Sequence, residues 1–123
     1  RVFRSARRRL SGWRILAPKE KEKLIDDLDD ALLAFERQRF DTTLLRMLQI
    51  ALRVFQVIDQ HHEDTPMEPK QHDLHEDTLP LAPLHLASHL LSDLQEQSRA
   101  RELLPEERLI AVAAFQKIVD EAV

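Results

Sequence analysis

The chain has 123 residues, a formal net charge of −4 and no cysteine. This length suits one domain that buries a sizeable core without disulfides, and the lack of cysteine excludes thiolate nucleophiles and cysteine zinc sites. A single glycine leaves no glycine-rich loop for a phosphate, and no stretch reaches the roughly 20 apolar residues of a membrane span.

The charge is divided unevenly along the chain. Residues 1–19 carry seven basic side chains and no acidic one, whereas the other 11 basic residues and all 22 acidic residues follow, so the two parts have charges of +7 and −11. This asymmetry indicates a basic arm on an acidic body. We predict an arm at residues 1–17, within which residues 2–10 are a candidate short extra helix, and a single helical domain at 18–123.

The composition of the arm also bears on location. Its first 13 residues are rich in arginine, contain serine and lack acidic residues, as organellar transit peptides do. The sequence therefore favours a mitochondrial protein, and a cytoplasmic protein with a basic arm is the alternative.

Two amphipathic helices are predicted in the first half of the domain. The first begins at Pro18, a favoured first helical position, and extends to about Arg39 with an acidic outer face. The second spans about Thr42 to Gln60, with Asp41 as its expected N-cap. Apolar residues cover most of its circumference, which predicts a central helix with several neighbours.

Residues 61–83 interrupt this pattern. They contain four prolines and many carboxylates, and proline removes a backbone hydrogen bond from a helix. We predict a long acidic loop, a kind of segment that is usually functional or disordered. Its histidines, which suit weak binding of a divalent ion or a gain of charge between about pH 7 and 5, are His61, His62, His72 and His75. A polar linker is the simpler interpretation.

Two further helices are predicted after the loop. The third spans about Leu84 to Leu103, and the fourth extends from Pro105 to about Ala122 with Leu109 among its buried residues. Short connections join the helices within each half, which implies antiparallel pairs. The predicted fold class is therefore all-α: a four-helix bundle built from two antiparallel helical hairpins, with a basic N-terminal arm.

The arm is the main candidate for a binding site, because arginines contact anions and an aromatic ring can stack on a base. Its candidate residues are Arg4, Arg7, Arg8, Arg9, Trp13 and Arg14. They suit nucleic acid, an anionic lipid head group, a carboxylate patch on a partner protein, or the acidic face of the chain's own first helix. Trp13, beside a helix start, fits a lid on the core better than a base-stacking platform.

A polar stripe on the second helix is another candidate surface. It consists of Arg46, Gln49, Arg53 and Gln56, of which Arg46 and Arg53 are the partner-binding candidates. The simpler interpretation is that each arginine pairs with acidic residues of the first helix.

His85, His89 and Asp93 follow one another at four-residue spacing on the third helix and are weak metal-ligand candidates. The glutamate that follows the first histidine of a metalloprotease helix is missing, and no other helix supplies the glutamates of a di-iron bundle. No metal or other cofactor is predicted.

No nucleophile with its base and orienting residue can be identified, so no enzymatic activity is predicted. The leading hypothesis is a non-enzymatic helical scaffold or accessory subunit that docks with other protein subunits in a larger assembly. One alternative is a nucleic-acid-binding module, for example a ribosome-associated one, that uses the basic arm. The other is a helical-bundle metal-binding protein.

Overall fold

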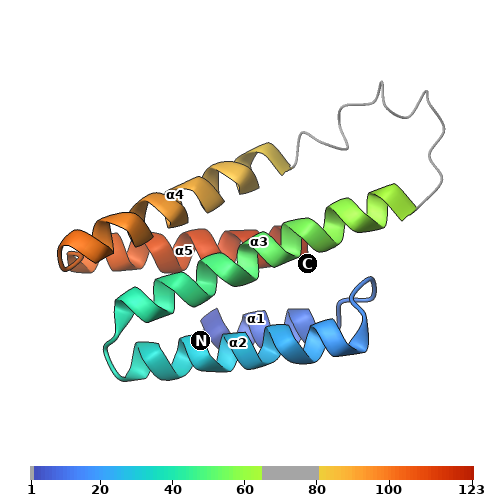
Figure 1. The fold of residues 1–123 in the computed structure, drawn as a ribbon, viewed down its shortest axis with the longest axis horizontal. Coiled ribbons are helices and arrows are strands. Elements are labelled where there is room, and N and C mark those ends of the chain that lie inside the picture. Colours follow the sequence, from blue (N-terminus) through green and yellow to red (C-terminus); the bar gives the residue numbers. More distant parts are fainter. Residues whose placement is uncertain (1, 65–80) are drawn as a thin grey trace.

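The computed structural model describes residues 2–64 and 81–123, which form five helices and no strands (Figure 1). The predicted all-α class is confirmed. The helices are α1 (Val2–Ser11), α2 (Pro18–Glu36), α3 (Phe40–Asp64), α4 (Leu81–Ala100) and α5 (Pro105–Ala122). Within the described residues, no helix combines the length and the apolar character that crossing a membrane requires.

The candidate short helix in the basic arm is present as α1 and contributes to the core. Phe3, Ala6 and Leu10 are its buried residues, and their spacing of three and four places them on one face. This face packs against both α2 and α5. Trp13 and Leu16, in the connection to α2, belong to the same core. The N-terminal segment is therefore held along the body of the molecule.

A Schellman motif ends α2. The N–H of Arg39 donates to the carbonyl of Ala34 at 2.8 Å, and the N–H of Gln38 donates to the carbonyl of Phe35 at 3.0 Å. Gln38 has the left-handed φ of 61° that this motif requires. The helix consequently stops at Glu36, short of the predicted end at Arg39.

The start of α3 differs from the prediction that Asp41 is its N-cap. The helix begins at Phe40, and the carbonyl of Arg39 accepts the hydrogen bond from the N–H of Thr43 at 3.1 Å. Asp41 lies instead in the first turn, where a negative charge favours the positive end of the helix dipole. The predicted central position of α3 is confirmed, because it contacts α2, α4 and α5.

The helices on either side of the predicted loop are longer than expected. Of residues 61–83, residues 65–80 lie outside the described part of the chain, whereas 61–64 continue α3 and 81–83 begin α4. Pro83, one of the four prolines predicted to break the helical pattern, lies instead in the first turn of α4. A backbone N–H there makes no hydrogen bond within the helix, so proline costs none.

The carboxylate of Glu107 stabilises the connection between α4 and α5. Glu107 accepts a hydrogen bond from the backbone N–H of Leu104 at 2.8 Å, which is one half of a capping box. It also accepts two from Arg101, at 2.8 and 2.7 Å. The predicted start at Pro105 is confirmed, while α4 ends at Ala100 rather than Leu103.

All five helices share one core. Each supplies fully buried side chains to it, such as Leu10, Leu28, Met47, Leu91 and Phe115. Since no helix has a core of its own, the five described helices form one packed unit.

Candidate partner-binding surfaces

Two arginines of α1 are paired within the chain. Arg7 forms an ion pair with Asp29 of α2, and Arg9 forms one with Asp120 of α5 at 3.0 Å. Arg7 and Arg9 lie on opposite sides of the buried face of α1, so Arg7 can reach α2 while Arg9 can reach α5. Of the four alternatives for the arm, contact with the acidic face of the next helix is the one that Arg7 makes, while Arg9 pairs with the last helix.

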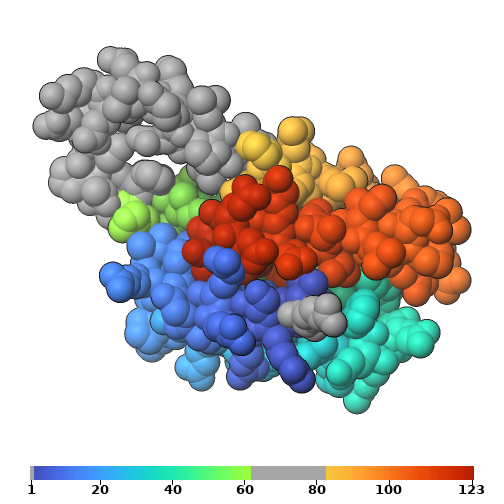
Figure 2. Space-filling view, turned by 180° about the vertical axis from the view of Figure 1, so that it is seen from behind, coloured from blue at the N-terminus to red at the C-terminus, as the bar shows by residue number. Residues whose placement is uncertain are grey.

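The other candidates in the N-terminal segment are divided between surface and core. Arg4, Arg8 and Arg14 are exposed, and no ion pair is found for them among the described residues. Figure 2 shows the outer side of α1 beside α5. Trp13 is only 9% exposed and packs in the core, as the lid interpretation predicted. It is therefore not placed to stack on a base.

The predicted polar stripe on α3 lines a groove of about 470 Å³ against α2. Arg53 forms a two-point ion pair with Glu20, at 2.6 and 2.9 Å, and its hydrogen bonds lower the pKa of Glu20. Arg46 instead donates to Gln49 at 3.0 Å. The prediction that both arginines pair with acidic residues is thus correct for Arg53 and wrong for Arg46.

The weak metal candidates of α4 are not gathered into a site. His85, His89 and Asp93 are all exposed, and His85 stacks on Phe55 with 4.7 Å between ring centroids. No group of three or more potential metal ligands occurs within residues 2–64 and 81–123. His72 and His75 lie outside the described residues, whereas His61 is an exposed residue of α3.

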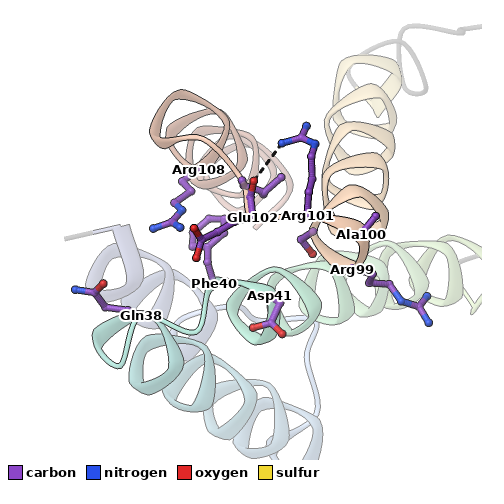
Figure 3. A pocket seen from close by; sticks show the side chains of 10 residues that line it. Gln38, Phe40, Asp41, Arg99, Ala100, Arg101, Glu102 and Arg108 are labelled. Carbon is purple, nitrogen blue, oxygen red and sulfur yellow. Dashed lines mark hydrogen bonds between the residues drawn. The ribbon is translucent and has the colours of Figure 1, made fainter.

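A further surface, which the sequence analysis did not identify, lies where the α2–α3 and α4–α5 connections meet. One hollow of about 620 Å³, here called the apolar groove, is lined mainly by Phe35, Phe40, Leu109 and Val112. A second hollow of about 390 Å³, here called the polar pocket, has charged walls (Figure 3). Its charged lining residues are Asp41, Arg99, Arg101, Glu102 and Arg108.

Arg108 lies where the two hollows meet. Together with Phe40 and Gln38 it lines both of them, and its guanidinium carbon lies 5.6 Å from the centroid of the Phe40 ring. Its Nε is buried and has no hydrogen-bond partner among the described residues. A cation with an unsatisfied donor is thus fixed beside an apolar hollow.

The charge of the neighbouring Arg101 is balanced within the chain. Its two hydrogen bonds to Glu107, together with the Leu104 N–H, lower the pKa of that carboxyl to about 2. Figure 3 shows Arg99 extending away from Phe40. Arg108 is therefore the basic group that faces the apolar groove.

Helical periodicity placed Leu109 on the wrong side of α5. It was predicted to be buried but is 72% exposed, because it lies on the side of α5 opposite the buried residues Ala111, Ala114 and Ile118. Phe35 and Leu104 are also exposed, at 44% and 56%. The uninterrupted apolar run from Leu109 to Phe115 was the available indication, since it is wider than one buried face needs.

Comparison of the chain with protein-family models, with curated proteins and with solved structures finds no match. The surfaces described above are therefore the basis for a functional proposal.

Proposed function

We propose that this chain is a non-enzymatic helical scaffold or accessory subunit that docks with other protein subunits in a larger assembly. The observation that supports this proposal is the exposure of Leu109 and Phe35, which line the apolar groove. Large apolar side chains gathered around a hollow, with polar groups at its rim, are typical of protein interaction sites. A partner that covers them removes apolar surface from water.

The arrangement of the helices fits a scaffold. We interpret α2 with α3, and α4 with α5, as the two antiparallel hairpins of a four-helix bundle to which α1 is added. The ribbon in Figure 1 supports this reading, since consecutive helices run in opposite directions. Such a bundle hosts many functions, so the exposed surfaces rather than the architecture support the docking role.

The first test is co-purification of the tagged chain from its natural source, followed by size-exclusion chromatography. We expect a partner protein at constant stoichiometry across the elution peak. Recovery of the chain as a lone monomer, with no stoichiometric partner after mild cross-linking, would show that the docking role is wrong. Imaging of a fluorescent fusion would test the predicted mitochondrial location against a cytoplasmic one.

Nucleic-acid binding through α1 is the second candidate function. The exposed side chains of Arg4, Arg8 and Arg14 favour it, and an anionic lipid surface would use the same groups. Because Arg7 and Arg9 are already paired, about three arginines remain for phosphates. A plot of the logarithm of the association constant for a single-stranded RNA against the logarithm of the salt concentration should then have a slope of only about −2.

Fluorescence anisotropy with a labelled RNA oligonucleotide, at several salt concentrations, tests this alternative. Binding that is lost when Arg4, Arg8 and Arg14 are replaced by Gln would support it. No binding at low salt would remove it. The metal-binding alternative gains no support, because the described residues contain no ligand cluster.

A further inference from the structure

We propose that the apolar groove and Arg108 together recognise a segment of a partner protein in which a large apolar side chain lies next to a carboxylate. This inference rests on the docking role proposed above and specifies the chemistry of the partner. It follows from three features of one small region: an apolar hollow, an unsatisfied cation at its wall and a rigid turn between them.

The groove accepts an apolar side chain. Its walls come from the end of α2, the start of α3 and the first turns of α5, which contribute Phe35, Phe40 and Leu109. The Phe35 ring contacts the Phe3 and Phe40 rings, with centroid distances of 5.7 Å and 6.2 Å. A hollow of about 620 Å³ lies within the usual range of ligand pockets and can take a leucine or phenylalanine side chain.

Arg108 provides the position for the carboxylate. The Phe40 ring covers one side of its guanidinium, and its Nε lacks a hydrogen-bond partner among the described residues. The guanidinium as a whole forms no ion pair or side-chain hydrogen bond within the described part of the chain, although Arg108 is partly exposed. A carboxylate can pair with its terminal nitrogens through charge-assisted, often two-point, hydrogen bonds. The partner's carboxylate would therefore bind at the edge of the groove.

The other charged groups limit the partner to a single carboxylate. Glu36 lines the apolar groove, while Asp41 and Glu102 line the polar pocket. Arg101 is neutralised by Glu107. A run of phosphates or a strongly acidic peptide would be repelled by several of these carboxylates, whereas one carboxylate placed at Arg108 would have Glu36 as the only acidic residue lining the same groove among the described residues.

The wall shared by the two hollows is preorganised. Gln38 is held in its left-handed conformation by the Schellman motif, and Phe40 follows it at the start of α3. Arg108 lies in the first turn of α5, which Glu107 and Leu104 cap. Because these groups are already ordered, binding requires little further loss of conformational entropy.

The test is a nuclear magnetic resonance titration of the isotope-labelled full chain with three small probes. N-acetyl-leucine carries an apolar side chain beside a carboxylate, N-acetyl-leucinamide carries the side chain alone, and acetate carries the carboxylate alone. We expect N-acetyl-leucine to bind most tightly and to shift the methyl signals of Leu109 and Val112 and the Arg108 side-chain signals. Equal binding of the three probes, or shifts that map elsewhere, would overturn the inference.

Two variants separate the parts of the site. Arg108→Gln should weaken binding of N-acetyl-leucine by about tenfold, the effect of losing one charge-assisted hydrogen-bonded pair, and leave the amide probe unchanged. Leu109→Ser should weaken both probes. Both residues lie at the surface or at its edge, and an unchanged melting temperature will verify folding. Ile110→Ser and Arg8→Gln are the matched controls, because these exposed residues do not line the groove.

The same variants distinguish this inference from the docking role. If a natural partner co-purifies equally with the wild type, Arg108→Gln and Leu109→Ser, the partner docks elsewhere and the inference is wrong while the proposed function stands. If no partner is recovered but the probes bind in the groove, the docking role fails while the recognition chemistry holds. Loss of the partner in both variants, but not in the controls, would support both.

Discussion

Glu107 and Arg108 are neighbours in α5, but the charge of Glu107 is paired within the chain and that of Arg108 is not paired within residues 2–64 and 81–123. Glu107 is satisfied three times, by the two hydrogen bonds from Arg101 and by the backbone N–H of Leu104. Arg108 has a buried Nε without a partner. The first residue thus stabilises the α4–α5 connection, while the partly exposed guanidinium of the second forms no ion pair among the described residues and lies beside the apolar groove.

Glu107→Gln should change the pH dependence of stability. Hydrogen bonds to the ionised carboxyl lower its pKa from 4.5 to about 2, so its contribution to the free energy of unfolding is present above pH 4.5 and is lost as the pH falls to about 2. Urea unfolding at a series of pH values should show the variant less stable than the wild type near neutrality, with the difference shrinking over that range. Glu106→Gln, at the exposed neighbouring position, is the control. A difference that stays constant with pH would contradict the prediction.

Gln38→Gly should stabilise the protein. A non-glycine residue with a φ of 61° is strained by roughly 1–2 kcal/mol, and glycine removes this strain at an entropic cost of about 0.5–1 kcal/mol. We expect a net gain of about 0.5–1 kcal/mol in the free energy of unfolding, measured with urea. Gln38→Ala should give no comparable gain, since alanine keeps the Cβ. Equal stability of the glycine and alanine variants would count against this explanation.

At the scale of elements, α1 is the helix whose role changed most between sequence and structure. Its charge suggested an arm that reaches a partner, yet Leu10 is fully buried and both flanks are paired to neighbouring helices. Exposed ion pairs contribute little, typically 0–1 kcal/mol each. Apolar burial is therefore the main force that holds α1 in place.

Leu10→Ala should consequently lower the free energy of unfolding by about 2–5 kcal/mol, as removal of a fully buried leucine does. Arg8→Ala, on the outer side of the same helix, should change it by less than about 0.5 kcal/mol. Chemical unfolding followed by circular dichroism measures both. If Leu10→Ala had no larger effect than Arg8→Ala, α1 would be an arm that adds nothing to the core.

For the whole molecule, a core shared by five helices implies cooperative unfolding. Trp13 is the only tryptophan and reports on the connection between α1 and α2, whereas far-ultraviolet circular dichroism reports on all the helices. The two signals should give the same urea midpoint. A tryptophan transition at lower urea would indicate that the N-terminal segment detaches before the rest unfolds.

Local patterns predicted much of the fold, but they missed the surface proposed here. Pro18 and Pro105 marked the starts of α2 and α5 correctly, because proline is favoured at the first helical position. The predicted helix ends were less accurate. The left-handed residue that ends α2 is Gln38, and without a glycine the sequence gives no sign of this turn. The sequence predicted that Arg53 pairs with an acidic residue of the first helix, which the structure identifies as Glu20, whereas it did not predict the position of Arg108 over Phe40.

The sequence by itself determined the all-helical class, the approximate positions of the helices and the central place of α3, because apolar spacing reveals how much of each helix must be buried. Only the tertiary structure decided that α1 packs between α2 and α5, that Leu109 stays exposed, and that Phe35 and Arg108 share a groove. These outcomes depend on residues far apart in the chain. Periodicity shows that a helix has apolar residues, but the packing of the other helices decides which of them are covered and which, such as Leu109, stay exposed.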